Sequence, residues 1–270
     1  MASPTLFNSG TISPQLCSCF LCTGSDSTDG ICKLQTGLAK ISRCSGGIGF
    51  WWDLRSKGEP VSGINGHASG PIPMMAILEK TAMAFNQGGK RNGSFASYMT
   101  PFHPDFVEWV GCRRPTGQLQ KLYYACWIPD VFMEAVRDDS EWYFFDPKRY
   151  PLVYNSYGDE LKKHYTDGID KKLYKTHVNA RKIWSEILLT QKQTGMPYML
   201  YSDQCNKYSN QKNLGVIKSS NLCVSGDTQI LTSMGYYDID KFSGKEVEIW
   251  NGKYLSKVTV KKTNDSAKLK

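Results

Sequence analysis

Residues 219–228 read Ser-Ser-Asn-Leu-Cys-Val-Ser-Gly-Asp-Thr, and the character of the sequence changes within this stretch. Upstream, segments with helical periodicity alternate with short apolar segments typical of strands, which predicts an α/β fold with a parallel or mixed sheet. Downstream, strand-like segments separated by glycine-containing turns predict an all-β module. We therefore place a domain boundary at Leu222/Cys223, with residues 1–222 in one domain and residues 223–270 in the other.

The upstream elements follow from apolar periodicity and from turn residues. The expected strands are residues 16–22, 94–99, 123–128, 142–145, 198–201 and 214–218, and the expected helices are residues 31–44, 73–86, 103–111 and 131–136. Residues 159–182 are charged and indicate a solvated helical face. Thr176 is expected to cap a further helix that ends near Thr194, before Gly195 and Pro197.

The downstream part carries four expected strands, at residues 228–232, 236–239, 246–250 and 254–261. Asn251-Gly252 stands between the last two. An Asn-Gly pair between two β-rich segments predicts a two-residue hairpin turn. No segment with helical periodicity occurs in this part.

Composition limits the class of protein. Of the 270 residues, 40% are hydrophobic, which is ordinary for a folded protein. A run of about 18 apolar residues, as a membrane-spanning helix needs, is absent, and the first residues lack the pattern of a signal peptide. We therefore expect a cytoplasmic protein without a membrane partner. The net charge of +8 is spread thinly. It indicates a mildly basic solvated surface or binding of anionic small molecules such as nucleotides, and we expect no direct nucleic-acid binding.

Nine cysteines in a protein without a secretion signal favour reduced thiols, some of them redox-active, over a disulfide framework. Cys17, Cys19 and Cys22 are spaced too irregularly for a structural zinc site, and no second pair follows at ligand spacing, so we predict no metal site. Cys19 has the apolar neighbours Phe20 and Leu21. Taken alone, this context favours a buried small apolar residue over a reactive thiol.

A series of motifs occurs in a fixed order along residues 2–222. They are residues 2–8 (Ala-Ser-Pro-Thr-Leu-Phe-Asn), 14–21 (Pro-Gln-Leu-Cys-Ser-Cys-Phe-Leu), 45–49 (Ser-Gly-Gly-Ile-Gly), 86–91 (Asn-Gln-Gly-Gly-Lys-Arg), 127–130 (Trp-Ile-Pro-Asp), 195–201 (Gly-Met-Pro-Tyr-Met-Leu-Tyr), 213–215 (Asn-Leu-Gly) and 219–223 (Ser-Ser-Asn-Leu-Cys). With these motifs, the segment resembles the large, catalytic subunit of class I ribonucleotide reductase. The resemblance implies part of a ten-stranded α/β barrel built from two parallel half-sheets.

The resemblance also implies roles in ribonucleotide reduction. Cys19 matches the first of two cysteines that close a disulfide as they supply two electrons to the ribose. Asn221 matches an amide that hydrogen-bonds the ribose. Further substrate-binding positions would be Ser3, Ser18, Gly46 and Gly47.

Positions matching the family's effector site would bind ATP or a deoxynucleoside triphosphate. They are Asp26, Ser27, Thr28, Arg43, Arg55, Ser62 and Gly63. Lys90 and Arg91 belong to a basic turn that would relay the effector's identity to the substrate base. Without the resemblance, this turn would be interpreted as a solvated turn.

The partners implied by the family are a ribonucleoside diphosphate, a second large subunit and a small subunit. A thioredoxin- or glutaredoxin-type dithiol would be the reductant. This chain itself would bind no cofactor, because a separate metal-containing small subunit supplies the radical.

The sequence departs from the family pattern at several positions. Cys17 replaces a usual serine, and Trp51 and Trp52 are unusual after the glycine motif. After Cys223 the family has one residue and then a glutamate, whereas here Val-Ser-Gly-Asp-Thr follows.

The residues from Cys223 onward resemble the opening block of an intein, a self-splicing element with a β-rich Hint fold. Cys223 would then be the splicing nucleophile that attacks the Leu222 carbonyl. In the alternative interpretation, Cys223 is the radical cysteine of a divergent reductase.

The later splicing motifs Thr-x-x-His and His-Asn do not follow Cys223 within the 270 residues, and neither does the family's glutamate after the radical cysteine. We therefore expect the chain alone to neither reduce nucleotides nor splice in cis. It would be a gene fragment or the N-terminal half of a trans-splicing pair that needs a C-terminal intein half. A nucleotide-binding remnant that uses Asp26 and Arg55, or a product that does not fold, are the remaining hypotheses.

Overall fold

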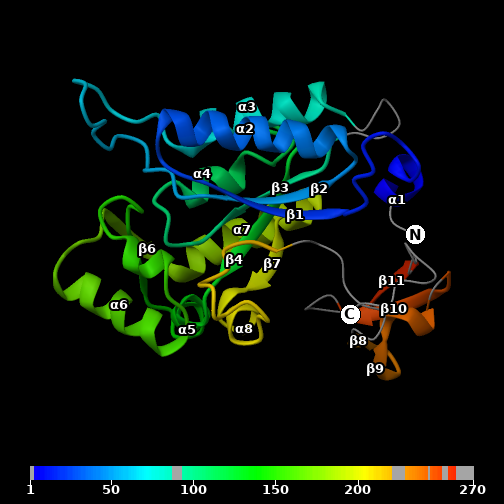
Figure 1. The fold of residues 1–270 in the computed structure, drawn as a ribbon. Coiled ribbons are helices and arrows are strands. Elements are labelled where there is room, and N and C mark those ends of the chain that lie inside the picture. Colours follow the sequence, from blue (N-terminus) through cyan, green and yellow to red (C-terminus); the bar gives the residue numbers. More distant parts are fainter. Residues whose placement is uncertain (1–2, 87–92, 221–228, 243, 251–254, 260–270) are drawn as a thin grey trace. The chain divides into compact units, whose positions relative to one another are not determined.

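The computed structural model describes residues 3–86, 93–220, 229–242, 244–250 and 255–259 (Figure 1). The chain forms two compact units. The larger one is Cys19–Asn221, and the smaller one combines Met1–Ser18 with Leu222–Lys270. Each unit is described by itself.

A five-stranded parallel sheet forms the centre of the larger unit. Its strands are β1 (Cys19–Gly24), β2 (Gly47–Trp52), β3 (Phe95–Met99), β4 (Tyr123–Ile128) and β7 (Tyr198–Tyr201), in the spatial order β1-β2-β3-β4-β7. All four strand pairs are parallel. The predicted α/β fold with a parallel sheet is therefore confirmed. A separate antiparallel pair consists of β5 (Glu141–Phe144) and β6 (Thr176–Asn179).

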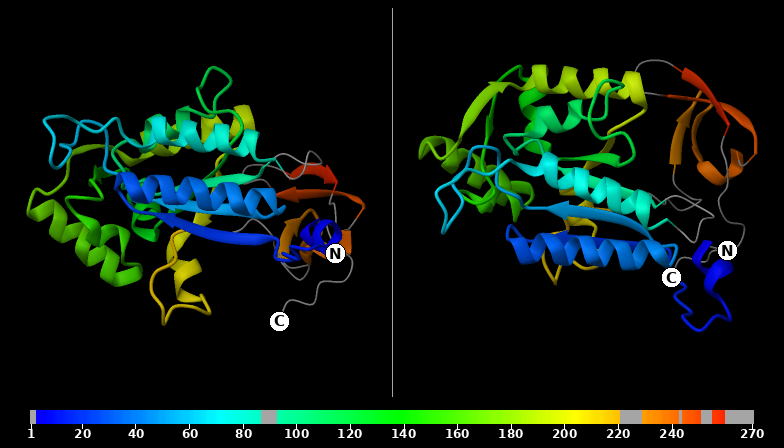
Figure 2. Two further views of the ribbon diagram at one scale, coloured as in Figure 1. Left: turned by 45° about the horizontal axis from the view of Figure 1, so that its top comes forward. Right: turned by 90° about the horizontal axis from the view of Figure 1, so that it is seen from above.

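Helices lie between the strands of the larger unit and after its last strand. They are α2 (Thr28–Arg43), α3 (Pro71–Ala84), α4 (Phe106–Gly111), α5 (Asp130–Arg137), the 3-10 helix η1 (Pro151–Tyr154), α6 (Gly158–Asp170), α7 (Ala180–Thr194) and α8 (Ser202–Lys207). Helices α2 and α3 run side by side along the sheet (Figure 2). Among the described residues, no helix combines the length and the apolar character that crossing a bilayer requires.

The two faces of the sheet differ because side chains alternate along each strand. One face packs beneath helices: Phe50 and Tyr124 are buried there, and the Ser97 hydroxyl lies 3.7 Å from the Met75 sulfur of α3. The strand register places Cys19, Gly49, Tyr98 and Trp127 on the other face, which we call the Cys19 face. Along β1 the residues of this face are exposed, whereas those on the helix side are half-buried.

The smaller unit contains α1 (Ser3–Asn8) and an antiparallel sheet in the order β11-β10-β8-β9. Its strands are β8 (Gln229–Thr232), β9 (Gly235–Asp238), β10 (Glu246–Trp250) and β11 (Leu255–Thr259), with the 3-10 helix η2 (Ile239–Phe242) after β9. These strands lie where the sequence predicts them. The expected hairpin turn at Asn251-Gly252 lies outside the described residues, although β10 and β11 pair antiparallel on either side of it.

Four expectations about local structure are wrong. Thr176 starts strand β6 instead of capping a helix, and α7 begins at Ala180 after Asn179, whose side chain accepts a hydrogen bond from the Arg181 amide at 3.0 Å. Pairing of β6 with β5 overrides the helical character of the sequence here. Residues 159–182 are accordingly not one helical face. Residues 214–218 form no strand, and the first strand starts at Cys19 instead of Leu16.

Candidate active site and nucleotide-binding site

Cys19 lies opposite Gly47 in the register of β1 and β2. Since paired residues of parallel strands point to the same face, both belong to the Cys19 face. The Cys19 side chain is exposed, which contradicts the interpretation of an isolated buried thiol. Gly47 has no side chain that could cover it. The thiol is therefore accessible from this face.

Residues 216–220 form a segment that crosses the Cys19 face at Gly49. A Cβ atom at position 49 would lie 2.4 Å from the Ser220 carbonyl oxygen and 3.3 Å from the Tyr98 ring. Burial raises the pKa of the Tyr98 hydroxyl to about 12, against a smaller opposite effect of the Ser220 backbone. Only glycine fits between strand and segment. The segment ends directly before Asn221, which lies outside the described residues.

Asn206 of α8 fixes the start of this segment. Its Oδ1 accepts a hydrogen bond from the Ile217 amide at 2.8 Å, and its Nδ2 donates to the Ile217 carbonyl at 3.1 Å and to the Ser202 carbonyl at 3.0 Å. The Asn206 side chain is buried. The hydrogen bonds of the Asn206 side chain take the place of the backbone hydrogen bonds that a neighbouring strand would form. They hold the segment 216–220 although it is not a strand.

The glycine at position 46 has a packing reason of its own. A Cβ atom there would lie 2.5 Å from Ile41 Cγ2 and 2.8 Å from the Phe20 ring. Packing of α2 against β1 therefore suffices to require glycine at this position. Contact of Gly46 with a substrate stays a prediction.

Four of the predicted effector residues meet at the N-terminal end of α2. The Arg55 Nε lies 2.6 Å from Asp26 Oδ2, and Arg55 Nη1 donates to the Pro60 carbonyl at 2.7 Å. Ser27 caps the helix, because its Oγ accepts a hydrogen bond from the Gly30 amide at 3.0 Å, and Thr28 is the first helical residue. The helix N-terminus favours anions here, and the Asp26 carboxylate that lies beside it is paired with Arg55.

The other predicted site residues are not gathered at this point. Ser62 and Gly63 lie exposed in the loop that follows Pro60, where Gly63 has a φ of +83°. Arg43 is in the last turn of α2, so it lies about 22 Å along the helix axis from Thr28 at 1.5 Å per residue. Ser3 and Ser18 belong to the smaller unit. Lys90, Arg91, Asn221 and Cys223 lie outside the described residues.

Known proteins resemble this chain over most of its length. The family profile described as "Ribonucleotide reductase, barrel domain" matches residues 17–225. The chain belongs to this family. The ribonucleoside-diphosphate reductase large subunit of Arabidopsis thaliana is 44% identical over 229 residues, covering 82% of this chain and 28% of the relative. That of Plasmodium falciparum (isolate Dd2) is 40% identical over 271 residues, covering 96% of this chain and 34% of the relative. The chain thus spans about a third of the length of these curated relatives.

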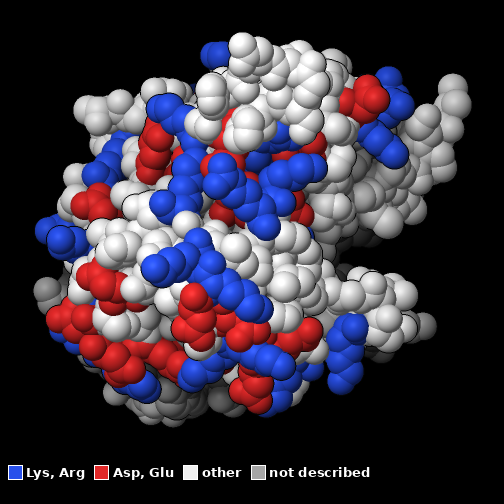
Figure 3. Space-filling view, turned by 90° about the vertical axis from the view of Figure 1, so that its left-hand side faces the viewer, with Lys and Arg blue, Asp and Glu red and all other residues white. Residues whose placement is uncertain are grey.

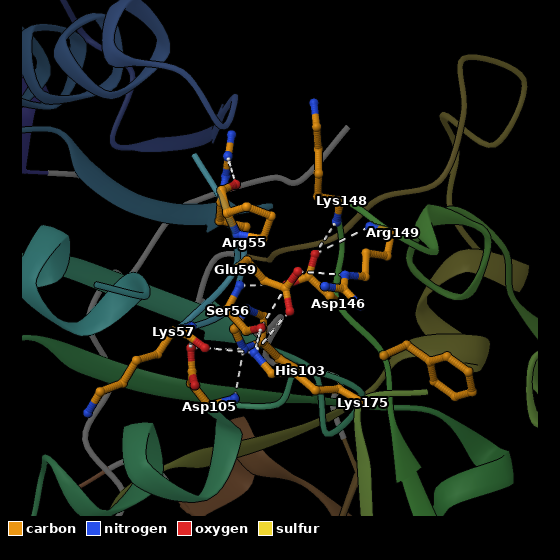
Figure 4. A network of polar contacts seen from close by, with 12 residues as sticks. Arg55, Ser56, Lys57, Glu59, His103, Asp105, Asp146, Lys148, Arg149 and Lys175 are labelled. Atoms are coloured by element: carbon orange, nitrogen blue, oxygen red, sulfur yellow. Dashed lines mark hydrogen bonds and ion pairs between the residues drawn. The ribbon is translucent and has the colours of Figure 1, made fainter. Parts of the chain in front are cut away.

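This member of the reductase barrel family holds a buried polar network that sequence reasoning missed (Figure 4). It lies after the ends of β2, β3 and β5. Asp146 Oδ2 accepts hydrogen bonds from the Ser56 amide at 2.7 Å and the Ser56 hydroxyl at 2.8 Å, and Asp146 Oδ1 accepts from the Lys148 amide at 2.8 Å. Both Ser56 and Asp146 are buried. The network therefore fixes the chain one residue beyond Arg55.

Two cations complete the network around Glu59. Arg149 Nε lies 2.6 Å from Glu59 Oε2, and Lys175 Nζ lies 3.1 Å from Glu59 Oε1 and 2.9 Å from the Ser56 hydroxyl. Figure 3 shows the flank of the molecule on which Lys and Arg side chains are interspersed with Asp and Glu. Because Arg149 and Lys175 share the single carboxylate of Glu59, we interpret both contacts as structural ion pairs.

His103 links the network to the end of β2. Its Nδ1 accepts a hydrogen bond from the Asp105 amide at 3.0 Å, so its Nε2 carries the proton and donates to the Leu54 carbonyl at 2.9 Å. Burial lowers the pKa of this imidazole. The ring is therefore neutral, and its approach to the Asp105 carboxylate is not an ion pair.

Four thiols, two of them buried and two half-buried, have raised pKa values. Burial raises the pKa of Cys22, Cys126 and Cys205, and it raises the pKa of Cys112 to about 11. Since the thiolate is the reactive form, these groups are poor nucleophiles at neutral pH. Within the part of the chain that the structure describes, no three His, Cys, Asp or Glu side chains are grouped to hold a metal ion.

The contact of Gly49 with Ser220 predicts a destabilising Gly49→Ala substitution. The added methyl group overlaps the Ser220 carbonyl oxygen, so we expect a loss of about 1–3 kcal/mol in the free energy of unfolding, measured by urea denaturation. Gly37→Ala is the control, because a Cβ atom in the middle of α2 meets nothing within 4 Å. It should stabilise by about 0.5–1 kcal/mol. Equal urea midpoints for Gly49→Ala and the unmodified chain would contradict the close contact.

His103 predicts a pH dependence of stability. Its pKa is lowered in the folded state, so below the unfolded-state pKa of about 6.5 only the unfolded chain takes up this proton. The contribution of His103 to the free energy of unfolding is fully present above that pH, and it falls by up to about 1.4 kcal/mol per pH unit below it. His103→Gln keeps a donor and an acceptor, and we expect a flatter free energy of unfolding between pH 7 and pH 5.5. The exposed His67→Gln control should keep the slope of the unmodified chain, and the same slope in His103→Gln would exclude this contribution.

Proposed function

We propose that this chain is part of the large subunit of a ribonucleoside-diphosphate reductase and contributes to the conversion of ribonucleotides to deoxyribonucleotides. The observation that supports this most directly is the meeting of distant motifs on one face. Cys19 lies opposite Gly47, and Ser220 lies against Gly49, two residues further along β2. Residues of the second, third and last family motifs thereby border one face of the sheet.

In this proposal, Cys19 is one of two thiols that reduce the ribose. Two thiols and a ribonucleotide yield a deoxyribonucleotide, a disulfide and water, so the thiol pair supplies both electrons. Asn221 hydrogen-bonds the ribose, and Ser3, Ser18, Gly46 and Gly47 border the substrate. A separate metal-containing small subunit supplies the radical that starts the reaction. The five-stranded sheet is one half of the ten-stranded barrel.

Asp26, Ser27, Thr28 and Arg55 form an effector site for ATP or a deoxynucleoside triphosphate in this proposal. The helix N-terminus offers amide groups and Arg55 offers a cation to a phosphate. Arg43 stands at the opposite end of α2, so one chain cannot bring it to the same nucleotide. A second large subunit would supply it, which makes the effector site one shared between two copies, with Ser62, Gly63, Lys90 and Arg91 bordering it.

Deoxynucleoside triphosphate titration of the full chain tests the effector site. We expect saturable binding, weakened about tenfold or more in Arg55→Ala because a charge-assisted contact is lost. Arg137→Ala is the control, since it removes an equally basic side chain whose ion pair with Asp138 is exposed. Absence of saturable binding to the unmodified chain would contradict the site. Binding without any nucleotide reduction after addition of a small subunit and a dithiol would favour a nucleotide-binding remnant.

We further propose that Cys223 begins a protein-splicing element of the Hint type. The reductase family match ends at residue 225, two residues past Cys223, and the strands β8 to β11 that follow form an antiparallel sheet unlike the parallel one before. The Cys223 thiol would attack the Leu222 carbonyl and convert the peptide bond into a thioester, with the Cys223 nitrogen leaving as an amine. Residues 1–222 would then be retained in the spliced product, and residues 223–270 would belong to the splicing element that is removed.

One observation favours the alternative in which Cys223 is the radical cysteine of a divergent reductase. The alignment with the Plasmodium falciparum subunit covers 96% of this chain, and so extends beyond Cys223. The splicing proposal predicts a ligated product and the radical-cysteine alternative predicts none, so an experiment can distinguish the two.

Intact-mass measurement tests the splicing element. Mixed with a complementary C-terminal intein half that carries a Cys-x-Glu extension, the chain should yield a product in which Leu222 is joined to that extension. Cys223→Ala should yield none, whereas Cys205→Ala should behave like the unmodified chain. If no ligated mass forms with the unmodified chain under reducing conditions, the splicing proposal is wrong and the radical-cysteine alternative is favoured.

A further inference from the structure

An ion pair over an aromatic ring joins the segment 216–220 to the end of β2. The Lys218 Nζ lies 2.7 Å from Asp53 Oδ2 and 5.9 Å from the centroid of the Trp51 ring. The second carboxylate oxygen, Asp53 Oδ1, accepts a hydrogen bond from Trp51 Nε1 at 2.7 Å. Both oxygens of Asp53 are thus engaged, and the ammonium group has a carboxylate and an aromatic ring as partners.

This contact is largely removed from water. The Lys218 side chain is 13% exposed and Trp51 is 3% exposed, whereas the Asp53 side chain keeps 36% exposure. Cation–aromatic and charge-assisted contacts gain strength as solvent is excluded. The indole ring also fixes the carboxylate in one orientation, which lowers the entropy cost of holding the lysine. Trp51, a departure from the family pattern in the sequence, therefore has a specific role in this chain.

The lysine is placed where it controls the position of the segment. Ile217 before it is held by Asn206, and Ser219 after it is buried. The next residue, Ser220, lies against Gly49. Within the described residues the segment belongs to no strand, so side-chain contacts of this kind hold it. Lys218 stands three positions before Asn221.

We infer that Trp51, Asp53 and Lys218 are positioning residues that fix residues 217–220 to the sheet and thereby shape the Cys19 face for the ribose of a ribonucleoside diphosphate. The inference about the ribose rests on the proposed reductase function. The inference that the ion pair fixes residues 217–220 stands on the geometry alone.

Three variants of the full chain test it. Lys218→Met keeps the aliphatic stem and removes the charge, Asp53→Asn removes the opposite charge, and Lys218→Arg keeps the positive charge. Lys162→Met is the control, because it breaks the exposed Lys162–Glu134 pair of 2.6 Å elsewhere on the larger unit. Two quantities are measured: amide hydrogen exchange of residues 217–220, and affinity for cytidine diphosphate by titration calorimetry.

We expect amide exchange of residues 217–220 to rise about tenfold in Lys218→Met and Asp53→Asn, and affinity for cytidine diphosphate to fall by a similar factor. Exchange in β2 and β3 should stay unchanged in both. Lys218→Arg and Lys162→Met should match the unmodified chain in both measurements.

The outcomes separate the inference from the function on which it partly rests. If Lys218→Met and Asp53→Asn leave exchange at residues 217–220 unchanged, the positioning role is overturned. If Lys218→Arg loses protection as much as Lys218→Met, the ion pair with Asp53 is not what holds the segment. If the unmodified chain binds no cytidine diphosphate, the substrate site of the proposed function fails, while the exchange measurement still decides the positioning role.

Discussion

The contact between the Ser220 carbonyl and the backbone of Gly49 determines how closely the segment 216–220 lies on the Cys19 face. A strand position with a side chain would push the segment 216–220 away from the sheet, since even a methyl group would lie 2.4 Å from the carbonyl oxygen. With glycine there, the main chain that leads to Asn221 lies directly on the strand next to the one that carries Cys19. Gly49 and Ser220, which lie far apart in the sequence, become neighbours because position 49 has no side chain.

The helix-covered face supplies the stability for this arrangement. Large side chains such as Phe50, Phe95 and Tyr124 are fully buried beneath helices, and burying each apolar side chain of this size contributes about 1.5–3 kcal/mol. The edge strand β1 can therefore keep its Cys19 side chain exposed without loss of the fold. One face of the sheet packs beneath helices, and on the other face the side chains of the edge strand β1 stay exposed.

The sequence predicts elements well where local and tertiary preferences agree. The predicted bounds of β4 and β7 coincide with the observed ones, because each is a continuous apolar run bounded by a proline or a polar turn. Thr176 fails as a helix cap because its segment pairs with β5, a contact that local periodicity does not contain.

The candidate site shows the same division. The family resemblance points to Cys19, Asp26 and Arg55, and the last two form an ion pair. Asp53, Ser56 and Asp146 carry no sequence signal, because the partner of Ser56 is 90 positions away and that of Asp53 is 165 positions away. Isolated polar residues of this kind become recognisable only once the chain is folded.

The four residues after β2 are all held, each by a different part of the chain. Asp53 pairs with Lys218, the Leu54 carbonyl accepts from His103, Arg55 pairs with Asp26, and Ser56 donates to Asp146. A stretch of four residues spans at most about 14 Å when extended. Its backbone therefore has little freedom to absorb a displacement locally. A change in the position of Arg55 must either break one of the neighbouring contacts or move Asp53, and with it the lysine that holds the segment before Asn221.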